Sequence, residues 1–263
     1  MKTALSIAGS DSSGGAGIQA DLKTFQATGT FGMSAITAIT AQNTLGVQES
    51  AIVSPELLEA QIRSVCEDIR PDAVKIGMVG NAVSIRCIAR LIQAYHLENV
   101  VLDPVMVATS GARLLASDQV QSLQADLIPL ARLITPNLSE ASVLYGQTIE
   151  TEAEMAEAGQ ALADHYQVAV LIKGGHLRGQ ARDVLALPEG RIEWFDASRI
   201  DNPNTHGTGC TLSSAIASYL AQGYPLEEAI QAGKTYLTGA IAAGLDLGQG
   251  HGPLDHGYGL HRG

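Results

Sequence analysis

In Val100-Val101-Leu102-Asp103-Pro104, a short and fully apolar strand stops at a carboxylate and a proline. A similar pattern returns in Leu133-Ile134-Thr135-Pro136-Asn137, where an apolar pair is followed by polar residues and proline. A third apolar run covers residues 168–172 and ends at Lys173. Strands without polar positions are buried on both faces, which is typical of a parallel sheet covered by helices on its two sides. The sequence therefore predicts an α/β fold.

Other β-like runs alternate with helical patterns along much of the chain. The expected elements follow from these alternating patterns. They are strands at residues 4–8, 34–40 and 73–76, an antiparallel hairpin at 183–187 and 191–195, and helices at 18–27, 83–95, 208–222 and 226–243. One more helix is expected to begin at Pro55, with Ser54 as its N-cap. No repeat or composition break divides the chain, so we expect a single domain over residues 1–263, with a central, mostly parallel sheet and helices on both faces.

Composition limits the classes of function. The chain has 263 residues, of which 46% are hydrophobic, and a net charge of −11. An acidic chain repels phosphate backbones, so we expect no nucleic-acid partner. No apolar run is long enough to span a bilayer, and the apolar start is too short for a signal peptide, so we expect no membrane partner and a cytoplasmic protein. The cysteines Cys66, Cys87 and Cys210 form no CxxC pair, which argues against a disulfide framework or a zinc site.

The ends of the predicted strands hold most of the polar and glycine residues of interest. In an open α/β sheet, ligands bind at the carboxyl ends of the strands. The segments at those ends are 9–17, 42–43, 75–80, Asp103, 137–140 and 173–176. Their composition suits a site for phosphate together with a sugar or a heterocycle.

The strongest local signal is Asn204-Thr205-His206-Gly207-Thr208-Gly209-Cys210-Thr211, which leads directly into a predicted helix. The first N–H groups of a helix lack internal partners and, with the helix dipole, bind anions. Glycines let a phosphate approach the backbone closely. Cys210 would stand at the helix start, a position that lowers the pKa of a thiol and makes it a candidate proton acceptor. The alternative is an ordinary glycine-rich loop with a buried cysteine.

A second glycine-rich loop, at residues 8–21, also connects a strand to a helix. It matches neither a P-loop nor a GxGxxG fingerprint. The loop could close over a small acceptor, with Asp11 or Asp21 as its hydrogen-bonding partner. The alternative is turn chemistry, with Asp21 on a solvated helix face.

Charged residues after other strands suggest how phosphate could be bound. Asp103 and Glu140 could together hold Mg²⁺, directly or through water. Glu140 also has the position of a capping-box residue, and both roles can hold at once. Lys173 could neutralise phosphate charge. The histidines of the glycine-rich tail, His251, His256 and His261, match no standard metal site and suggest a loop that packs over the site or a loose terminus.

Taken together, the chain resembles the hydroxymethylpyrimidine/phosphomethylpyrimidine kinase family. The similar stretches follow the family's order over nearly the whole chain: 6–11, 13–25, 36–38, 41–44, 75–78, 101–106, 134–138 with Glu140, 173–176, 204–211 and 250–253. The resemblance implies a ribokinase-like fold, use of ATP with Mg²⁺, and a homodimer. It also implies phosphorylation of 4-amino-5-hydroxymethyl-2-methylpyrimidine and its monophosphate in thiamine biosynthesis.

The resemblance also implies roles for individual residues. On the acceptor side are Gln42 as the pyrimidine-reading residue and Gly9 and Val105 beside the ring. Because of its place in the second glycine-rich loop, Asp21 is also expected to be a substrate partner. On the phosphate side are Gly207, Thr208 and Gly209 as the anion hole, Cys210 as the general base, Lys173 as a nucleotide-side lysine and Glu140 in the element that organises Mg²⁺ and phosphate. We also expect Asn137 and Thr205 to contact the nucleotide, and Asp103 to share the metal with Glu140. Two positions differ from common patterns: Ser12 stands where the family often has proline, and wider relatives often carry aspartate at the Cys210 position.

Three other functions remain open from the sequence. A pyridoxal or pyridoxine kinase shares the fold and the chemistry, although Gln42 favours an aminopyrimidine because a carboxamide both donates and accepts hydrogen bonds. A nucleotide- or sugar-binding module would bind ligand without releasing ADP. An NAD-dependent dehydrogenase is disfavoured by the missing GxGxxG fingerprint.

Overall fold

The computed structural model describes residues 1–106, 117–175, 182–196, 200, 202 and 204–259. Within these residues, nine strands form one sheet in the order β3-β2-β1-β4-β5-β6-β7-β8-β9. The strands are β1 (Thr3–Asp11), β2 (Phe31–Asn43), β3 (Gly46–Ile52), β4 (Ala73–Ile76), β5 (Val100–Leu102), β6 (Leu133–Ile134), β7 (Ala169–Ile172), β8 (Asp183–Ala186) and β9 (Ile192–Phe195).

The sheet is parallel from β2 to β7 and antiparallel at both edges. β3 pairs antiparallel with β2, and β8 and β9 continue from β7 as antiparallel strands. The expected α/β fold with a mostly parallel sheet is confirmed, as is the hairpin around Pro188-Glu189-Gly190. Strand β3 was not foreseen, because most of its residues are exposed and its sequence lacks the apolar pattern of a buried strand.

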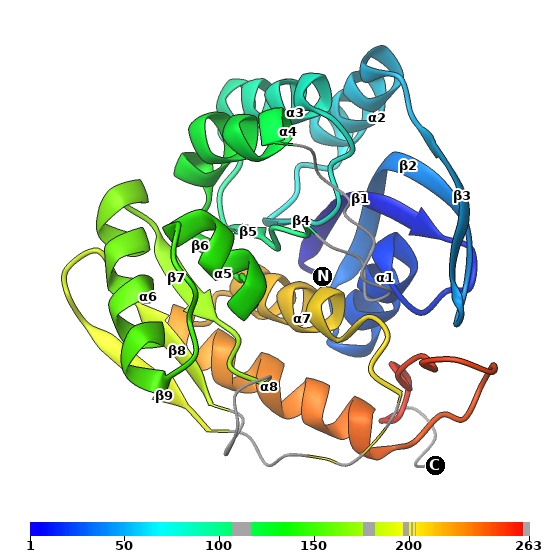
Figure 1. The fold of residues 1–263 in the computed structure, drawn as a ribbon. Helices are drawn as coiled ribbons and strands as arrows, with labels where there is room; N and C mark the ends of the chain where they lie inside the picture. The colour runs from blue at the N-terminus through cyan, green and yellow to red at the C-terminus, as the bar shows by residue number, and fades with distance from the viewer. Residues whose placement is uncertain (107–116, 176–181, 197–199, 201, 203, 260–263) are drawn as a thin grey trace.

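Helices cover both faces of the sheet, as Figure 1 shows. They are α1 (Gly17–Ala27), α2 (Pro55–Asp68), α3 (Ala82–Ala94), α4 (Ser117–Ser122), α5 (Leu138–Tyr145), α6 (Glu152–Tyr166), α7 (Thr208–Ala221) and α8 (Leu226–Ala242). A π-helical turn η1 (Leu123–Leu127) and a 3₁₀ turn η2 (Ile128–Leu130) follow α4.

The inner strands contribute to two separate cores, because neighbouring side chains of a strand point to opposite faces. In β5, Val100 and Leu102 pack with residues of α2, α3, α5 and α6, whereas Val101 packs with residues of α1, α7 and α8. This arrangement explains why the strand has no polar position. Cys66 and Cys87 are buried and free, as expected from their helical segments.

Local signals for helix starts are also confirmed. The Ser54 hydroxyl caps α2 by accepting from the Leu57 N–H at 3.3 Å, and Pro55 occupies the first turn. No helix among the described residues is both long enough and apolar enough to cross a membrane.

Candidate active site

The carboxyl ends of β5, β6 and β7 bring three predicted site residues together. Lys173 Nζ lies 2.9 Å from Asp103 Oδ1, and the Thr135 hydroxyl donates to the same oxygen at 3.2 Å. Asn137 and Lys173 form a β-bridge between the segments that follow β6 and β7. Parallel strands deliver their carboxyl ends to one edge of the sheet, so residues far apart in sequence meet there.

The first turn of α7 lies against this ion pair. A Cβ added to Gly209 would stand 3.3 Å from both Asp103 Oδ2 and Lys173 Nζ. Gly207 forms the N-cap with φ +85, and no side chain caps the helix. No side chain therefore competes for the first N–H groups of the helix, and Gly209 lies in its first turn beside Lys173. The binding of an anion at Gly207, Thr208 and Gly209 stays a prediction.

Glu140 joins the same cluster from the start of α5. Its carboxylate accepts from the Asn137 N–H at 2.8 Å, and its own N–H donates to Asn137 Oδ1 at 2.9 Å, which completes the expected capping box. Burial raises the pKa of Glu140 to about 7, against the lowering effect of Lys173, and Asp103 raises it further. For Lys173, burial acts in the opposite direction and lowers the pKa. The charges of Asp103 and Glu140 outweigh burial, so the pKa of Lys173 is also raised overall.

Asp103 and Glu140 suit a Mg²⁺ ion that is shared with phosphate. The described residues contain no group of three or more histidine, cysteine, aspartate or glutamate side chains that could hold a metal by themselves. Mg²⁺ is commonly held by one or two carboxylates, with water and substrate phosphates filling its other positions. Two neighbouring carboxylates beside an open helix start fit that requirement.

The structure contradicts one prediction from the sequence, the lowered pKa of the Cys210 thiol. The thiol is half-buried at the start of α7, but its pKa is raised rather than lowered. Burial is the largest cause, and Asp21 and Asp103 add to it, whereas Lys75 and a hydrogen bond from the Gly17 amide act in the lowering direction. The expectation of a lowered pKa is therefore wrong for the ligand-free protein, because desolvation and two carboxylates outweigh the helix start. The role of Cys210 as general base stays a prediction.

Asp21 requires a second correction. Its carboxylate is fully buried and accepts from Lys75 Nζ at 2.8 and 2.9 Å, from the Ser6 hydroxyl at 2.6 Å and from the Ser214 hydroxyl at 2.7 Å. Neither carboxylate oxygen is accessible to an acceptor substrate, so the expected role of Asp21 as a substrate partner is wrong. The alternative, a solvated helix face, is also wrong. Asp21 instead joins β1, α1, β4 and α7 through these hydrogen bonds, and its charge acts on the Cys210 thiol.

The residues expected on the acceptor side lie at the ends of β1, β2 and β5. Gly9 is buried, and a Cβ there would overlap the Met78 side chain. Val105 is half-buried and its N–H donates to the Asp103 carbonyl at 2.8 Å. Gln42 is half-buried, and its Nε2 lies 3.4 Å from His206 Nε2. His206 therefore connects Gln42 to the motif that starts α7.

Asp11, the other candidate partner for the acceptor, organises the loop that follows β1. It is 2% exposed. Oδ1 accepts from the N–H and hydroxyl of Ser13, and Oδ2 accepts from the Ala16 N–H and contacts His206 Nε2 at 2.9 Å. Burial raises the pKa of this carboxyl, but the hydrogen bonds from His206, Ser13 and Ala16 outweigh burial and lower it to about 2.

The C-terminal tail packs against the start of α7. His256 Nε2 lies 2.9 Å from the Thr211 hydroxyl, and residues 206 and 253 form a β-bridge. This agrees with a tail that packs at the site, although His261 lies outside the described residues. Thr205, expected as a nucleotide contact, is exposed, and its carbonyl accepts from the Thr208 N–H at 3.3 Å.

Sequence reasoning assigned no role to Lys75 or His206, and it gave His256 no role beyond that of a tail that packs over the site or is a loose terminus. Lys75 had a usable signal, because one lysine in the otherwise apolar Ala73-Val74-Lys75-Ile76 requires a buried partner. His206 belongs to the strongest motif of the chain. His256 lies in a glycine-rich tail, where nothing local indicates burial.

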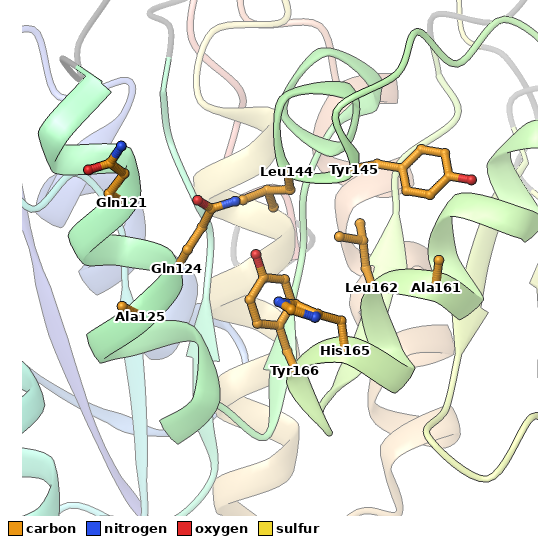
Figure 2. Close-up of a pocket in the computed structure, with 9 residues that line it drawn as sticks. All are labelled: Gln121, Gln124, Ala125, Leu144, Tyr145, Ala161, Leu162, His165 and Tyr166. Carbon is orange, nitrogen blue, oxygen red and sulfur yellow. The ribbon is translucent and has the colours of Figure 1, made fainter.

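A separate cavity of about 500 Å³ lies between η1, α5 and α6. Figure 2 shows its lining, which includes Gln121, Gln124, Tyr145, His165 and Tyr166. None of the predicted site residues contributes to it. The candidate site is therefore the edge of the sheet at α7, not this cavity.

Comparison with known proteins identifies related kinases. The model of the family described as "Phosphomethylpyrimidine kinase" matches residues 11–255 of this chain. A hydroxymethylpyrimidine/phosphomethylpyrimidine kinase of Rhizobium meliloti (strain 1021) is 52% identical over 256 residues, which cover 96% of each chain. The ADP complex of Bacillus subtilis pyridoxal kinase has a TM-score of 0.93 at 40% identity, with 100% of both chains covered. A phosphomethylpyrimidine kinase from Clostridium difficile 630 has a TM-score of 0.82 at 46% identity and covers 92% of this chain and 100% of its own.

Proposed function

The chain belongs to the phosphomethylpyrimidine kinase family, with a ribokinase-like fold, and we propose that it phosphorylates 4-amino-5-hydroxymethyl-2-methylpyrimidine and its monophosphate in thiamine biosynthesis. The chain is a phosphotransferase that uses ATP. The observation that carries the proposal is the open start of α7 beside the Asp103–Lys173 ion pair.

Phosphoryl transfer depends mainly on alignment and on stabilising the charge that develops on the transferred group. The N–H groups at Gly207, Thr208 and Gly209 would meet the terminal phosphate of ATP, and Lys173 would neutralise its charge. Mg²⁺, held by Asp103 and Glu140, would supply further neutralisation of phosphate charge when bound. Asn137 keeps Glu140 in place through the capping box, and Thr205 would contact the nucleotide.

Cys210 would accept the proton of the acceptor hydroxyl as that oxygen attacks the terminal phosphate. The raised pKa of the thiol means that little thiolate exists in the ligand-free protein at neutral pH. Lys75, held in the core beneath α7, is the charge that favours the thiolate most strongly. Only the thiolate can take that proton, so the base would act through the small fraction of the enzyme in which Cys210 is ionised, and this fraction grows as pH rises.

Acceptor recognition would lie with Gln42, Gly9 and Val105. The carboxamide of Gln42 can donate to and accept from an aminopyrimidine. A second candidate is phosphorylation of pyridoxal, favoured by the 40% identity and full coverage of the Bacillus subtilis pyridoxal kinase. Because that relative is a pyridoxal kinase, pyridoxal is the necessary competitor in any assay.

A coupled ADP-release assay with hydroxymethylpyrimidine, its monophosphate and pyridoxal in parallel tests the proposal. We expect ADP release with the first two acceptors and a lower kcat/KM with pyridoxal. ADP release with pyridoxal alone would replace the pyrimidine kinase by a pyridoxal kinase. Thermal stabilisation by ATP without ADP release from any acceptor would indicate a binding module instead.

We also propose that the chain is one domain, that it is cytoplasmic, and that it forms a homodimer through the edge strand β3. Edge strands present unpaired backbone groups that can pair with a second copy. The region around β3 exposes Leu45, Val47 and Ile52 at 64%, 38% and 52%. Sedimentation of the wild type and a Val47→Lys variant tests the dimer, which we expect the lysine to weaken; a monomeric wild type contradicts it.

A further inference from the structure

His206 belongs to the motif that starts α7, yet the proposed phosphoryl transfer gives it no role. The residue is 8% exposed. Its Nε2 lies 2.9 Å from Asp11 Oδ2 and 3.4 Å from Gln42 Nε2. One nitrogen thus contacts both a buried carboxylate and the amide expected to read the acceptor ring.

The carboxylate determines where the imidazole hydrogen lies. Asp11 accepts from two N–H groups and one hydroxyl besides His206, and its pKa is lowered to about 2 although burial acts to raise it. An ionised carboxylate only accepts hydrogen bonds. His206 Nε2 therefore carries a hydrogen and donates it to Asp11.

A protonated Nε2 cannot accept a hydrogen bond from the Gln42 amide nitrogen, which is itself a donor. The opposite end of the amide has a matching conflict. Thr40 Oγ1 lies 3.1 Å from Gln42 Oε1 and 2.7 Å from the Ser10 carbonyl, but its hydroxyl has one hydrogen for these two acceptors. The oxygen and nitrogen of an amide have nearly the same shape, and the hydrogen-bond network decides between them.

Turning the amide end for end removes both conflicts. Gln42 Oε1 then faces the His206 N–H, whose one hydrogen bonds to Asp11 at 2.9 Å and attracts the Gln42 oxygen at 3.4 Å as a weaker, shared contact. Gln42 Nε2 donates to Thr40, whose hydroxyl donates to Ser10. We propose that Asp11 and His206 are positioning residues that hold the Gln42 amide in this orientation and thereby set the choice of acceptor. The inference rests on the proposed function, in which Gln42 reads the ring.

The fixed amide leaves one lone pair and one N–H for a ligand. An aminopyrimidine places an amine donor beside a ring-nitrogen acceptor and satisfies both. A pyridine alcohol without that amine leaves the Gln42 oxygen without a donor, which costs affinity at a site built for hydrogen bonding. Selectivity therefore requires that the amide not turn to suit the competitor.

An Asp11→Asn variant tests the orientation. Its side-chain amide can donate to His206, which allows the other tautomer and removes the preference of Gln42 for one orientation. We expect kcat/KM for hydroxymethylpyrimidine to fall about tenfold through KM, with the KM for ATP and kcat/KM for pyridoxal unchanged.

The matched control is Ser13→Ala, which removes the hydroxyl bond to Oδ1 but leaves the Oδ2–His206 contact. Equal losses for both acceptors, or the same loss of selectivity in Ser13→Ala, would assign Asp11 a role in loop structure only and overturn the proposal.

Nitrogen-15 NMR of the histidines in the ligand-free wild type tests the hydrogen position without turnover. We expect His206 to show a protonated Nε2 at neutral pH and a loss of that fixed tautomer in Asp11→Asn. A bare Nε2 in the wild type would overturn the inference. Because this measurement needs no acceptor, a wild type that phosphorylates only pyridoxal would refute the proposed function while leaving the tautomer result readable.

Discussion

At the scale of the single residue, the reactivity of Cys210 depends on its surroundings more than on its position in the helix. A helix start favours a thiolate, but burial and the carboxylates of Asp21 and Asp103 raise the pKa of this thiol above its ordinary value of 9.0. Lys75 opposes them from within the core. The balance leaves a mainly protonated thiol at neutral pH, so only the minor thiolate fraction can accept the proton of the substrate hydroxyl.

This balance predicts how activity depends on pH. The basic form of a group whose pKa is raised becomes populated only as pH rises toward that pKa. We expect kcat of the wild type to keep rising between about pH 7 and 9 and not to level off near neutrality. Cys210→Ala should lower kcat by about 10²- to 10⁴-fold while the KM for ATP is retained. Steady-state kinetics across this range check both results, and near-normal turnover of Cys210→Ala would exclude the thiol as the base.

At the scale of the element, helix α7 depends on two glycines for different reasons. Gly207 has φ +85, and a Cβ there would overlap the Gly15 carbonyl. Gly209 is helical, and its hydrogen leaves the space between the first turn and the Asp103–Lys173 pair open. The first glycine is therefore needed for the loop contact, and the second for access of an anion to the helix start.

Alanine substitutions should separate these two requirements. We expect Gly207→Ala to lower stability by about 2 kcal/mol or more, and the Tm by about 4–8 °C, through strain and overlap. Gly209→Ala should change the Tm by less than about 2 °C but lower kcat/KM for ATP by about 10- to 100-fold, because its methyl group occupies the phosphate side. Calorimetry and steady-state kinetics measure the two effects.

The control for strain is Gly223→Ala. That glycine has φ +92 after α7, with nothing within 4 Å of an added Cβ. We expect it to cost about 1 kcal/mol without an effect on kcat/KM. A Gly209→Ala enzyme with wild-type kinetics would argue against phosphate binding at this helix start.

At the scale of the whole molecule, the buried Asp21–Lys75 pair joins the elements that surround the site. Both side chains are 0% exposed, and their partners Ser6 and Ser214 come from β1 and α7. Burying charges is costly, but removing one partner of a buried pair costs more, since it leaves an uncompensated charge. Either charge can therefore be buried without a large energetic cost only when α1, β1, β4 and α7 are assembled correctly.

Lys75→Met should lower the free energy of unfolding by about 3–5 kcal/mol. The double variant Asp21→Asn, Lys75→Met should be more stable than the sum of the single changes predicts, by up to about 3 kcal/mol. Urea denaturation measures each value. The exposed Lys2–Asp72 pair, at 2.7 Å, is the comparison, and Lys2→Met should cost less than about 1 kcal/mol. Strict additivity at Asp21 and Lys75 would show that the two charges do not depend on each other.

The sequence by itself determined the α/β fold, the parallel direction of the inner strands and the glycine-rich start of α7. Those features follow from local patterns: apolar runs such as 100–102 are buried on both faces, and glycines before a helix leave its first N–H groups available. Only the tertiary structure decided that Asp21 is buried against Lys75, that the pKa of Cys210 is raised, and that His206 lies between Asp11 and Gln42. Each of these depends on charges and hydrogen-bond partners brought by elements distant in the chain, and burial and pKa are set by that three-dimensional surrounding rather than by sequence neighbours.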